Sequence, residues 1–237
     1  MIVLYAWPTP NGQKIAIMLE ECGLDYEAVA VDINAGEQFA PGFLALSPNN
    51  RIPAIVDDEG PDGGCIGLFE SGAILQYLAE KTGRFMPRTG EGRYRVVEWL
   101  MFQMGGLGPM CGQAHHFRQR MGGEDVPYGI ERYTREVGRL YGVMDRRLAD
   151  NPYLAGGAYS IADIACWPWV RPHRRQGQDL ADFPALGRWF GEIRARPAVE
   201  RGMMLLDEHR GRRELTPEAR DLLFGAGQAA RAGGGEG

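Results

Sequence analysis

The chain has 237 residues, of which 44% are hydrophobic and 24% charged, and a formal net charge of −5. At about 150 residues per domain, this length predicts one large or two modest domains, each able to bury an ordinary core. The mildly negative charge disfavours nucleic acid as the main partner. No apolar run approaches the roughly 18 residues that cross a membrane. The first apolar run meets Pro8 too early for a signal peptide.

Cysteine and histidine positions indicate neither a disulfide framework nor a metal site. The cysteines are far apart and form no CxxC pair: Cys22, Cys65, Cys111 and Cys166. This usage is typical of reduced thiols in a cytoplasmic protein. The neighbours His115 and His116 would point about 100° apart on a helix, so they rarely share an ion and we expect no metal.

Residues 1–83 show the alternation expected of a small α/β domain. Strands are expected at 2–5, 26–31, 54–56 and 65–68, and helices at 14–22, 38–46 (or an irregular segment) and 71–82. The proline-rich stretch 7–12 predicts a loop, with Asn11 as the N-cap of the first helix. Since a helix joins the first two strands, these should be parallel, whereas the last two should form an antiparallel hairpin.

The rest of the chain predicts an all-helical domain at 91–209, after a linker rich in glycine and proline at 83–92. Helices are expected from 94 with an interruption at Gly105-Gly106, from Pro127, from the capping box Ser160–Asp163, at 183–194, and finally up to about 206. In the tail at 210–237, one or two helical turns are expected at 216–224. Its low-complexity end, from Gly225 onward, is expected to be disordered.

The stretch 47–74 carries the clearest signs of a binding site. Pro53 opens a strand, and a cis Ile52–Pro53 bond would turn the N–H and C=O of Ile52 away from the sheet, toward an extended peptide. Glu70 and Ser71 stand where a strand gives way to a helix, whose free N–H groups bind carboxylates. The stretch would thus hold a peptide backbone and an anionic end. A hairpin with one ordinary X-Pro turn, followed by a capped helix, is the structural alternative.

Three motifs together resemble the cytosolic glutathione transferase family: Asn-Arg-Ile-Pro-Ala at 50–54, Phe-Glu-Ser-Gly-Ala-Ile at 69–74 and Tyr-Ser-Ile-Ala-Asp-Ile at 159–164. The resemblance implies an α/β thioredoxin-like N-terminal domain followed by an all-α helical-bundle domain. Further segments are similar to the Nu class, whose bacterial members are glutathione-dependent disulfide-bond oxidoreductases: 9–12, 47–50, 105–110, 113, 115–117 and 165–169. The resemblance to this class also implies glutathione binding, a homodimer and reduction of small disulfides.

The loop at 7–12 lies where a thioredoxin-type fold places its catalytic group, yet it contains no cysteine. For redox chemistry, the thiol must therefore come from glutathione itself. The resemblance implies that Thr9 and Asn11 donate hydrogen bonds to that sulfur near the positive end of a helix, which favours thiolate over thiol. Neither side chain can act as a base at neutral pH. A loop hydroxyl and a plain N-cap are the structural alternatives.

The resemblance also implies which groups bind glutathione. Glu70 suits the ammonium of the γ-glutamyl group, and Ser71 with nearby N–H groups suits its carboxylate. The Ile52 backbone beside Pro53 would pair with the cysteinyl part. Gln38 corresponds to a position near the glycyl end.

Other positions complete the expected site. Arg51 is a second candidate at the glycyl end, and Arg132 corresponds to a cation by which the helical domain reaches the site. His115, His116 or Phe117 would line the pocket of the second substrate. Three functions stay open: reduction of small disulfides by glutathione, conjugation of glutathione to electrophiles, and a non-catalytic, regulatory role that binds glutathione or a partner protein. The loop at 7–12, which carries Thr9 and Asn11 and has no tyrosine, favours reduction of small disulfides.

Overall fold

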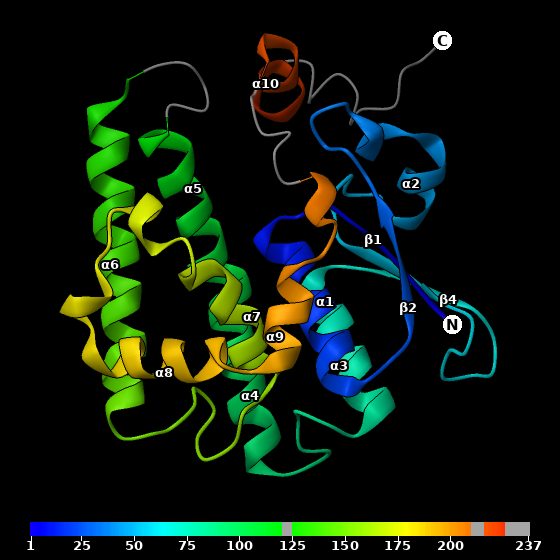
Figure 1. The fold of residues 1–237 in the computed structure, drawn as a ribbon, viewed down its shortest axis with the longest axis horizontal. Helices are drawn as coiled ribbons and strands as arrows, with labels where there is room; N and C mark the ends of the chain where they lie inside the picture. Colours follow the sequence, from blue (N-terminus) through cyan, green and yellow to red (C-terminus); the bar gives the residue numbers. More distant parts are fainter. Residues whose placement is uncertain (120–124, 210–215, 226–237) are drawn as a thin grey trace. The chain divides into compact units, whose positions relative to one another are not determined.

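Figure 1 shows the chain as a computed structural model, which describes residues 1–119, 125–209 and 216–225. These residues form two compact units. The first contains Met1–Ile74 and the chain from Arg201 onward, and the second contains Leu75–Glu200. The domain limits expected at 83 and 91 stay predictions. They follow from composition, whereas the two units are defined by proximity in space. The disorder expected after Gly225 concerns residues that lie outside the described part.

A four-stranded sheet in the order β2-β1-β3-β4 forms the centre of the first unit. Its strands are β1 (Ile2–Ala6), β2 (Tyr26–Ala30), β3 (Ala54–Asp57) and β4 (Ile66–Phe69). β1 is parallel to β2 and antiparallel to β3, which is antiparallel to β4. This confirms the predicted parallel pair and hairpin. Leu4 and Ile55 face each other in the register and have no exposed surface, so the two central strands carry much of the core.

Helix α1 (Pro10–Cys22) follows β1 and begins earlier than predicted. Thr9 is its N-cap, with Oγ1 accepting the Gly12 N–H at 3.5 Å, so the prediction of Asn11 as N-cap is wrong. The physical reason is Pro10 at the first helical position, where its fixed φ suits the helix and its missing N–H costs nothing. Gly23 ends the helix in the left-handed conformation, as predicted.

The remaining elements of the first unit connect the sheet. Between β2 and β3 the chain forms η1 (Glu37–Phe39) and α2 (Pro41–Leu46). After β4 it enters α3 (Ser71–Thr82), whose residues from Leu75 onward belong to the second unit. The Ile52–Pro53 peptide bond directly before β3 is cis.

The C-terminal segment returns to the first unit through α9 (Pro197–Met203), η5 (Asp207–His209) and α10 (Pro217–Phe224). Gly202 lies so close to α1 that a Cβ there would stand 2.6 Å from the backbone of Ile17. The ring of His209 lies 5.1 Å from that of Trp7. α10 confirms the helical turns predicted at 216–224. The first unit is therefore built from both ends of the chain.

The second unit is helical, as predicted. Its elements are α4 (Glu91–Phe102), η2 (Gln103–Leu107), α5 (Gly108–Arg118), α6 (Pro127–Ala149), α7 (Ile161–Val170), η3 (His173–Gln176), η4 (Leu180–Asp182) and α8 (Pro184–Arg194). η2 is a π-helical turn that contains Gly105-Gly106, so the predicted interruption is confirmed. None of the described helices is both long and apolar enough to cross a bilayer.

Asp163 holds three segments of the second unit together. Its Oδ1 accepts hydrogen bonds from Leu154 N (3.0 Å) and Trp189 Nε1 (2.9 Å). Its Oδ2 accepts from the N–H and the hydroxyl of Ser160, both at 3.0 Å, which confirms the predicted capping box. Burial raises the pKa of Asp163, and these hydrogen bonds oppose the rise. A carboxylate without exposed surface thus joins the start of α7 to the preceding loop and to α8.

Candidate functional site

One end of the sheet gathers the segments that carry most of the predicted glutathione contacts. Tyr5, near the end of β1, lies opposite Ala54 at the start of β3, and Ala54 lies opposite Phe69 at the end of β4. The loop after β1, the cis peptide bond before β3 and the helix after β4 therefore leave the sheet at the same end. The parallel β2 ends there too, with Ala30 beside Ala6. Segments that lie between Thr9 and Ser71 in the sequence are thus brought to one end of the sheet by the strand register.

The loop after β1 presents Thr9 and Asn11 at the start of α1. Both side chains are partly exposed, and the helix behind them has 13 residues, enough to give its N-terminus a positive potential. The Thr9 hydroxyl accepts the Gly12 N–H, and its own hydrogen is not used in that bond. Asn11 stands at the second helical position, in the first turn, whose N–H groups point toward the positive end of the helix. The loop can donate hydrogen bonds and contains no thiol.

The segment before β3 offers backbone groups at the sheet end. Pro53 is buried and Ile52 partly exposed. Ser47 Oγ donates to the Arg51 C=O at 2.8 Å, which holds the turn that leads to the cis bond. Among the hydrogen bonds of the described residues, none uses the N–H or C=O of Ile52. An extended peptide can therefore pair with Ile52, as a strand pairs at a sheet edge. The side chain of Arg51 is exposed.

Glu70 and Ser71 form the start of α3. The Glu70 carbonyl accepts the Ile74 N–H at 3.0 Å, which makes Glu70 the last residue before the helix. Its φ of 69° lies in the left-handed region, where a non-glycine residue costs of order 1 kcal/mol. Strain of this kind is common at binding sites. The first N–H groups of the helix, beginning with Ser71, can bind an anion, while the exposed Glu70 carboxylate can accept from an ammonium.

Gln38 is 3% exposed and lies in η1, beyond the end of β2. Its Nε2 donates to the Ile33 C=O at 3.2 Å, which fixes the amide. Its Oε1 is buried without a hydrogen-bond partner among the described residues. Buried acceptors are nearly always paired, so this oxygen is a candidate to accept from a bound N–H.

The other predicted residues lie in the second unit. His115 stacks on Trp169, with ring centroids 6.4 Å apart. Phe117 stacks on Tyr133 at 5.3 Å, a contact that holds α5 against α6. Partial burial lowers the pKa of His116. In the described part of the chain, no three His, Cys, Asp or Glu side chains gather as a metal site would require.

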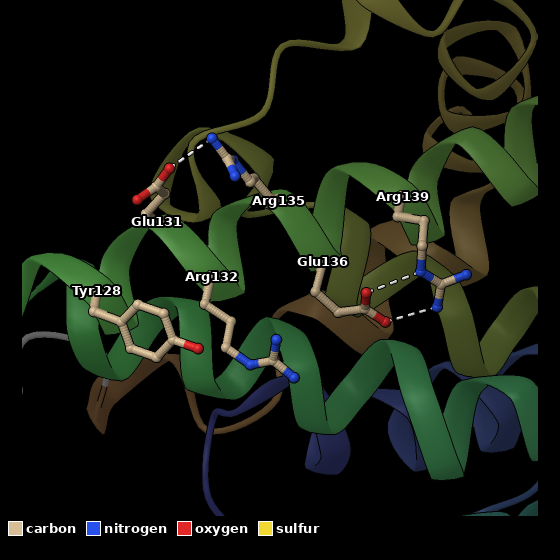
Figure 2. Close-up of a pocket in the computed structure, with 6 residues that line it drawn as sticks. All are labelled: Tyr128, Glu131, Arg132, Arg135, Glu136 and Arg139. Carbon is tan, nitrogen blue, oxygen red and sulfur yellow. Dashed lines mark hydrogen bonds and ion pairs between the residues drawn. The ribbon is translucent and has the colours of Figure 1, made fainter.

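Arg132 lines a shallow groove of about 530 Å³ along α6. The groove is formed by Tyr128, Glu131, Arg132, Arg135, Glu136 and Arg139. Arg135 pairs with Glu131 and Arg139 with Glu136, each at 2.6 Å. Figure 2 shows Arg132 beside Tyr128 with no interaction drawn to either of these pairs, and no ion pair of Arg132 occurs among the described residues. Its guanidinium is exposed and can reach an anion.

Sequence reasoning missed Lys14. It is 1% exposed, and its Nζ donates to Ser71 Oγ at 3.1 Å. The signal was a single lysine inside a run of apolar residues, at a position that faces the core.

Comparisons with known proteins show which family the chain is similar to. Residues 1–80 match the family description "Glutathione S-transferase, N-terminal domain", and residues 130–197 match "Glutathione S-transferase, C-terminal domain". The chain is 54% identical over 205 residues to the disulfide-bond oxidoreductase YfcG of Escherichia coli (strain K12), covering 86% of this chain and 95% of the relative.

Solved structures give the same result. A glutathione transferase family member from Pseudomonas fluorescens pf-5, with two glutathione bound, superposes with a TM-score of 0.81 at 46% identity, covering 85% of this chain and 92% of that one. A glutathione transferase from Pseudomonas putida, with one glutathione disulfide bound per subunit, gives 0.82 at 46% identity, covering 86% and 91%. The chain belongs to the glutathione S-transferase family, with its two-part fold of mixed sheet and helices.

Proposed function

We propose that this protein reduces small disulfides with the thiol of bound glutathione. The observation that carries the proposal is a loop without cysteine that keeps Thr9 and Asn11 at the positive end of α1. Such a loop can stabilise a thiolate that a ligand brings, and it cannot supply one. The similarity to a disulfide-bond oxidoreductase and to proteins that bind glutathione or its disulfide supports the same reaction.

In the proposed complex, glutathione lies across the sheet end as an extended peptide. Its cysteinyl part pairs with the backbone of Ile52 beside the cis Pro53. The γ-glutamyl ammonium meets Glu70, and the carboxylate meets Ser71 and the first N–H groups of α3. The glycyl end lies toward Gln38, whose unpaired Oε1 supports this assignment, and toward Arg51. This orientation directs the cysteinyl sulfur to the loop.

The proposed reaction is two thiol–disulfide exchanges. The glutathione thiolate attacks one sulfur of the substrate disulfide, forms a mixed disulfide and releases one product thiolate, which takes a proton from water. A second glutathione thiolate attacks the glutathione sulfur of that mixed disulfide, so glutathione disulfide and the second product thiolate leave. Two electrons pass from two glutathione thiols to the substrate. Thr9 and Asn11 stabilise the attacking sulfur as thiolate and transfer no proton.

The helical unit completes the proposal. His115, His116 and Phe117 are assigned to the pocket of the small disulfide, and Arg132 to a cationic contact with glutathione. We also propose a homodimer in the cytoplasm, without a nucleic acid or membrane partner. The four cysteines, all within the described residues, form no disulfide, which supports a reducing compartment.

The test measures two reactions on one purified sample: reduction of hydroxyethyl disulfide by glutathione, and conjugation of glutathione to chlorodinitrobenzene. Disulfide turnover well above conjugation is the expected result. The variants Thr9→Ala and Asn11→Ala should each lower kcat/KM for the disulfide by about 10- to 100-fold, the range for losing one hydrogen bond to a charged group.

Asn151→Ala is the matched control, because it removes an amide that donates to the Arg147 C=O at 3.0 Å in the other unit. Its turnover should stay unchanged. Conjugation well above disulfide reduction would instead make the protein an ordinary transferase. Silence in both assays, with glutathione disulfide still bound, would make it a binding protein. Unchanged turnover in Asn11→Ala would remove Asn11 from the site.

A further inference from the structure

The C-terminal segment 201–209 runs antiparallel to α1 within the first unit, from the last turn of that helix back to the loop before it. Neighbouring pairs join the two stretches in this order: Arg201 with Glu20, Gly202 with Ile17, Leu205 with Gly12 and His209 with Trp7. The first pair is an ion pair at 2.6 Å and the last a pair of rings. The segment therefore ends on the loop at 7–12, which carries the groups assigned to the glutathione sulfur.

Trp7 supports that loop through its backbone. Its C=O accepts the Thr9 N–H at 2.6 Å. The same oxygen would stand 2.5 Å from a Cβ on Gly12, so the first turn of α1 lies directly against it. The Gly12 N–H in turn donates to Thr9 Oγ1 at 3.5 Å. A shift of Trp7 would therefore displace both Thr9 and the start of α1.

His209 is the residue of the C-terminal segment that packs on the side chain of Trp7. Trp7 is 4% exposed, and the two ring centroids lie 5.1 Å apart, within the range of favourable aromatic pairs. Nδ1 of His209 is buried and has no hydrogen-bond partner among the described residues. Its Nε2 lies 3.6 Å from Oε1 of Glu208, which is too long for a hydrogen bond. The imidazole thus serves here as an aromatic surface, so another ring should be able to replace it.

We propose that His209 is a positioning residue for the loop at 7–12 and that it acts through Trp7. By covering the indole, it keeps Thr9 and the start of α1 in the geometry that stabilises the sulfur of bound glutathione as thiolate. Hydrogen bonds weaken as their distances and angles depart from the optimum, so a looser Trp7 reduces this stabilisation although every donor remains. The inference rests on the proposed function, since it takes bound glutathione as the source of the thiol. His209 itself transfers no proton.

The test follows ionisation of the thiol of bound glutathione, measured by the ultraviolet absorbance of the thiolate as pH rises. His209→Ala removes the ring, His209→Phe keeps one, and Met204→Ala is the control, because Met204 is exposed in the same segment. His209→Ala should lower the acid ionisation constant of the bound thiol by about 2- to 10-fold, the range for losing one aromatic pair. Below the pKa of that thiol, kcat for the disulfide should fall as well, because less thiolate is present. His209→Phe and Met204→Ala should both behave like wild type.

Two comparisons separate positioning of the loop from a general loss of structure. S-Methylglutathione has no ionisable thiol, so its affinity should be the same in His209→Ala and in wild type. In the background of Trp7→Leu, adding His209→Ala should have no further effect on thiol ionisation, because both changes remove the same contact. If Trp7→Leu fails to fold, His209→Phe still distinguishes the ring from the imidazole nitrogens.

Four results would overturn the role of His209 and leave the proposed function intact: an unchanged thiol in His209→Ala, equal effects of His209→Ala and His209→Phe, weaker binding of S-methylglutathione, or additive effects with Trp7→Leu. A different result would overturn the proposed function itself. In that case the thiol of glutathione bound to wild type would ionise no more readily than the thiol of free glutathione.

Discussion

Replacing Asp163 with Asn tests how the second unit is held together. Asn keeps one acceptor oxygen, which can still serve Leu154 and Trp189, and turns the other oxygen into an N–H donor. The new donor faces the Ser160 N–H, which is left buried without an acceptor at a cost of about 1–3 kcal/mol. The two retained bonds lose their charge assistance, at about 1 kcal/mol each.

A gain offsets part of this loss. Burial raises the pKa of Asp163, which means that the ionised carboxylate is held against a desolvation cost that the neutral amide avoids. We therefore expect Asp163→Asn to lower the free energy of unfolding by about 3 kcal/mol. For a chain of this size, the melting temperature should fall by about 6–12 °C.

Thermal unfolding followed by circular dichroism measures the change. The matched control is Asp179→Asn, because Asp179 caps η4 on the surface by accepting the Ala181 N–H at 3.0 Å, and Asn caps about as well. Its melting temperature should move by less than about 1 °C. If Asp163→Asn lowered the free energy of unfolding by less than about 1 kcal/mol, the four groups that donate to Asp163 would not need both of its carboxylate oxygens. That result would refute the reasoning.

Three further changes test other contacts. Burial, and then the charge of Glu20, raises the pKa of Tyr26 from 10.0 to about 12. The folded protein keeps this proton between pH 10 and 12 while the unfolded chain releases it, so stability should fall as pH rises through that window, and Tyr26→Phe should flatten the fall. Gly202→Ala should cost about 1–3 kcal/mol in urea unfolding, because its Cβ meets Ile17, whereas Gly191→Ala in open space should cost nothing. Gln38→Leu should raise the KM for glutathione several-fold with little change in melting temperature, and an unchanged KM would remove Gln38 from the site.

The succession of strands and helices along the chain could be predicted from the sequence, because hydrophobic period and glycine and proline positions indicate each element locally. β3 begins where Pro53 predicts and α1 ends at Gly23 for this reason. The start of α1 was missed although the signal was present. Thr9 followed by Pro10 is an N-cap followed by a proline at the first helical position, and these two residues together outweigh Asn11.

Contacts between distant residues could not be predicted in this way. Lys14 and Ser71 are 57 positions apart, and only the folded first unit brings the lysine on α1 to the serine at the start of α3. Likewise, whether Oε1 of Gln38 is paired depends on which carbonyl accepts the hydrogen bond of its amide nitrogen. The conformation of the η1 turn determines that this carbonyl is that of Ile33. Hydrophobic patterning carries no information on such pairings, because it describes one element at a time.

The return of the chain to the first unit has a consequence for biosynthesis. The backbone of Ile17 is covered by Gly202, so α1 keeps an open apolar face until the end of the chain leaves the ribosome. At the usual rate of translation, the roughly 130 residues between Ile74 and Arg201 take about 6–25 s to make. During this interval the nascent sheet and its first helix lack the contact between Gly202 and Ile17. Fragments that end near residue 80 should recover their fold only when the C-terminal segment is supplied in trans.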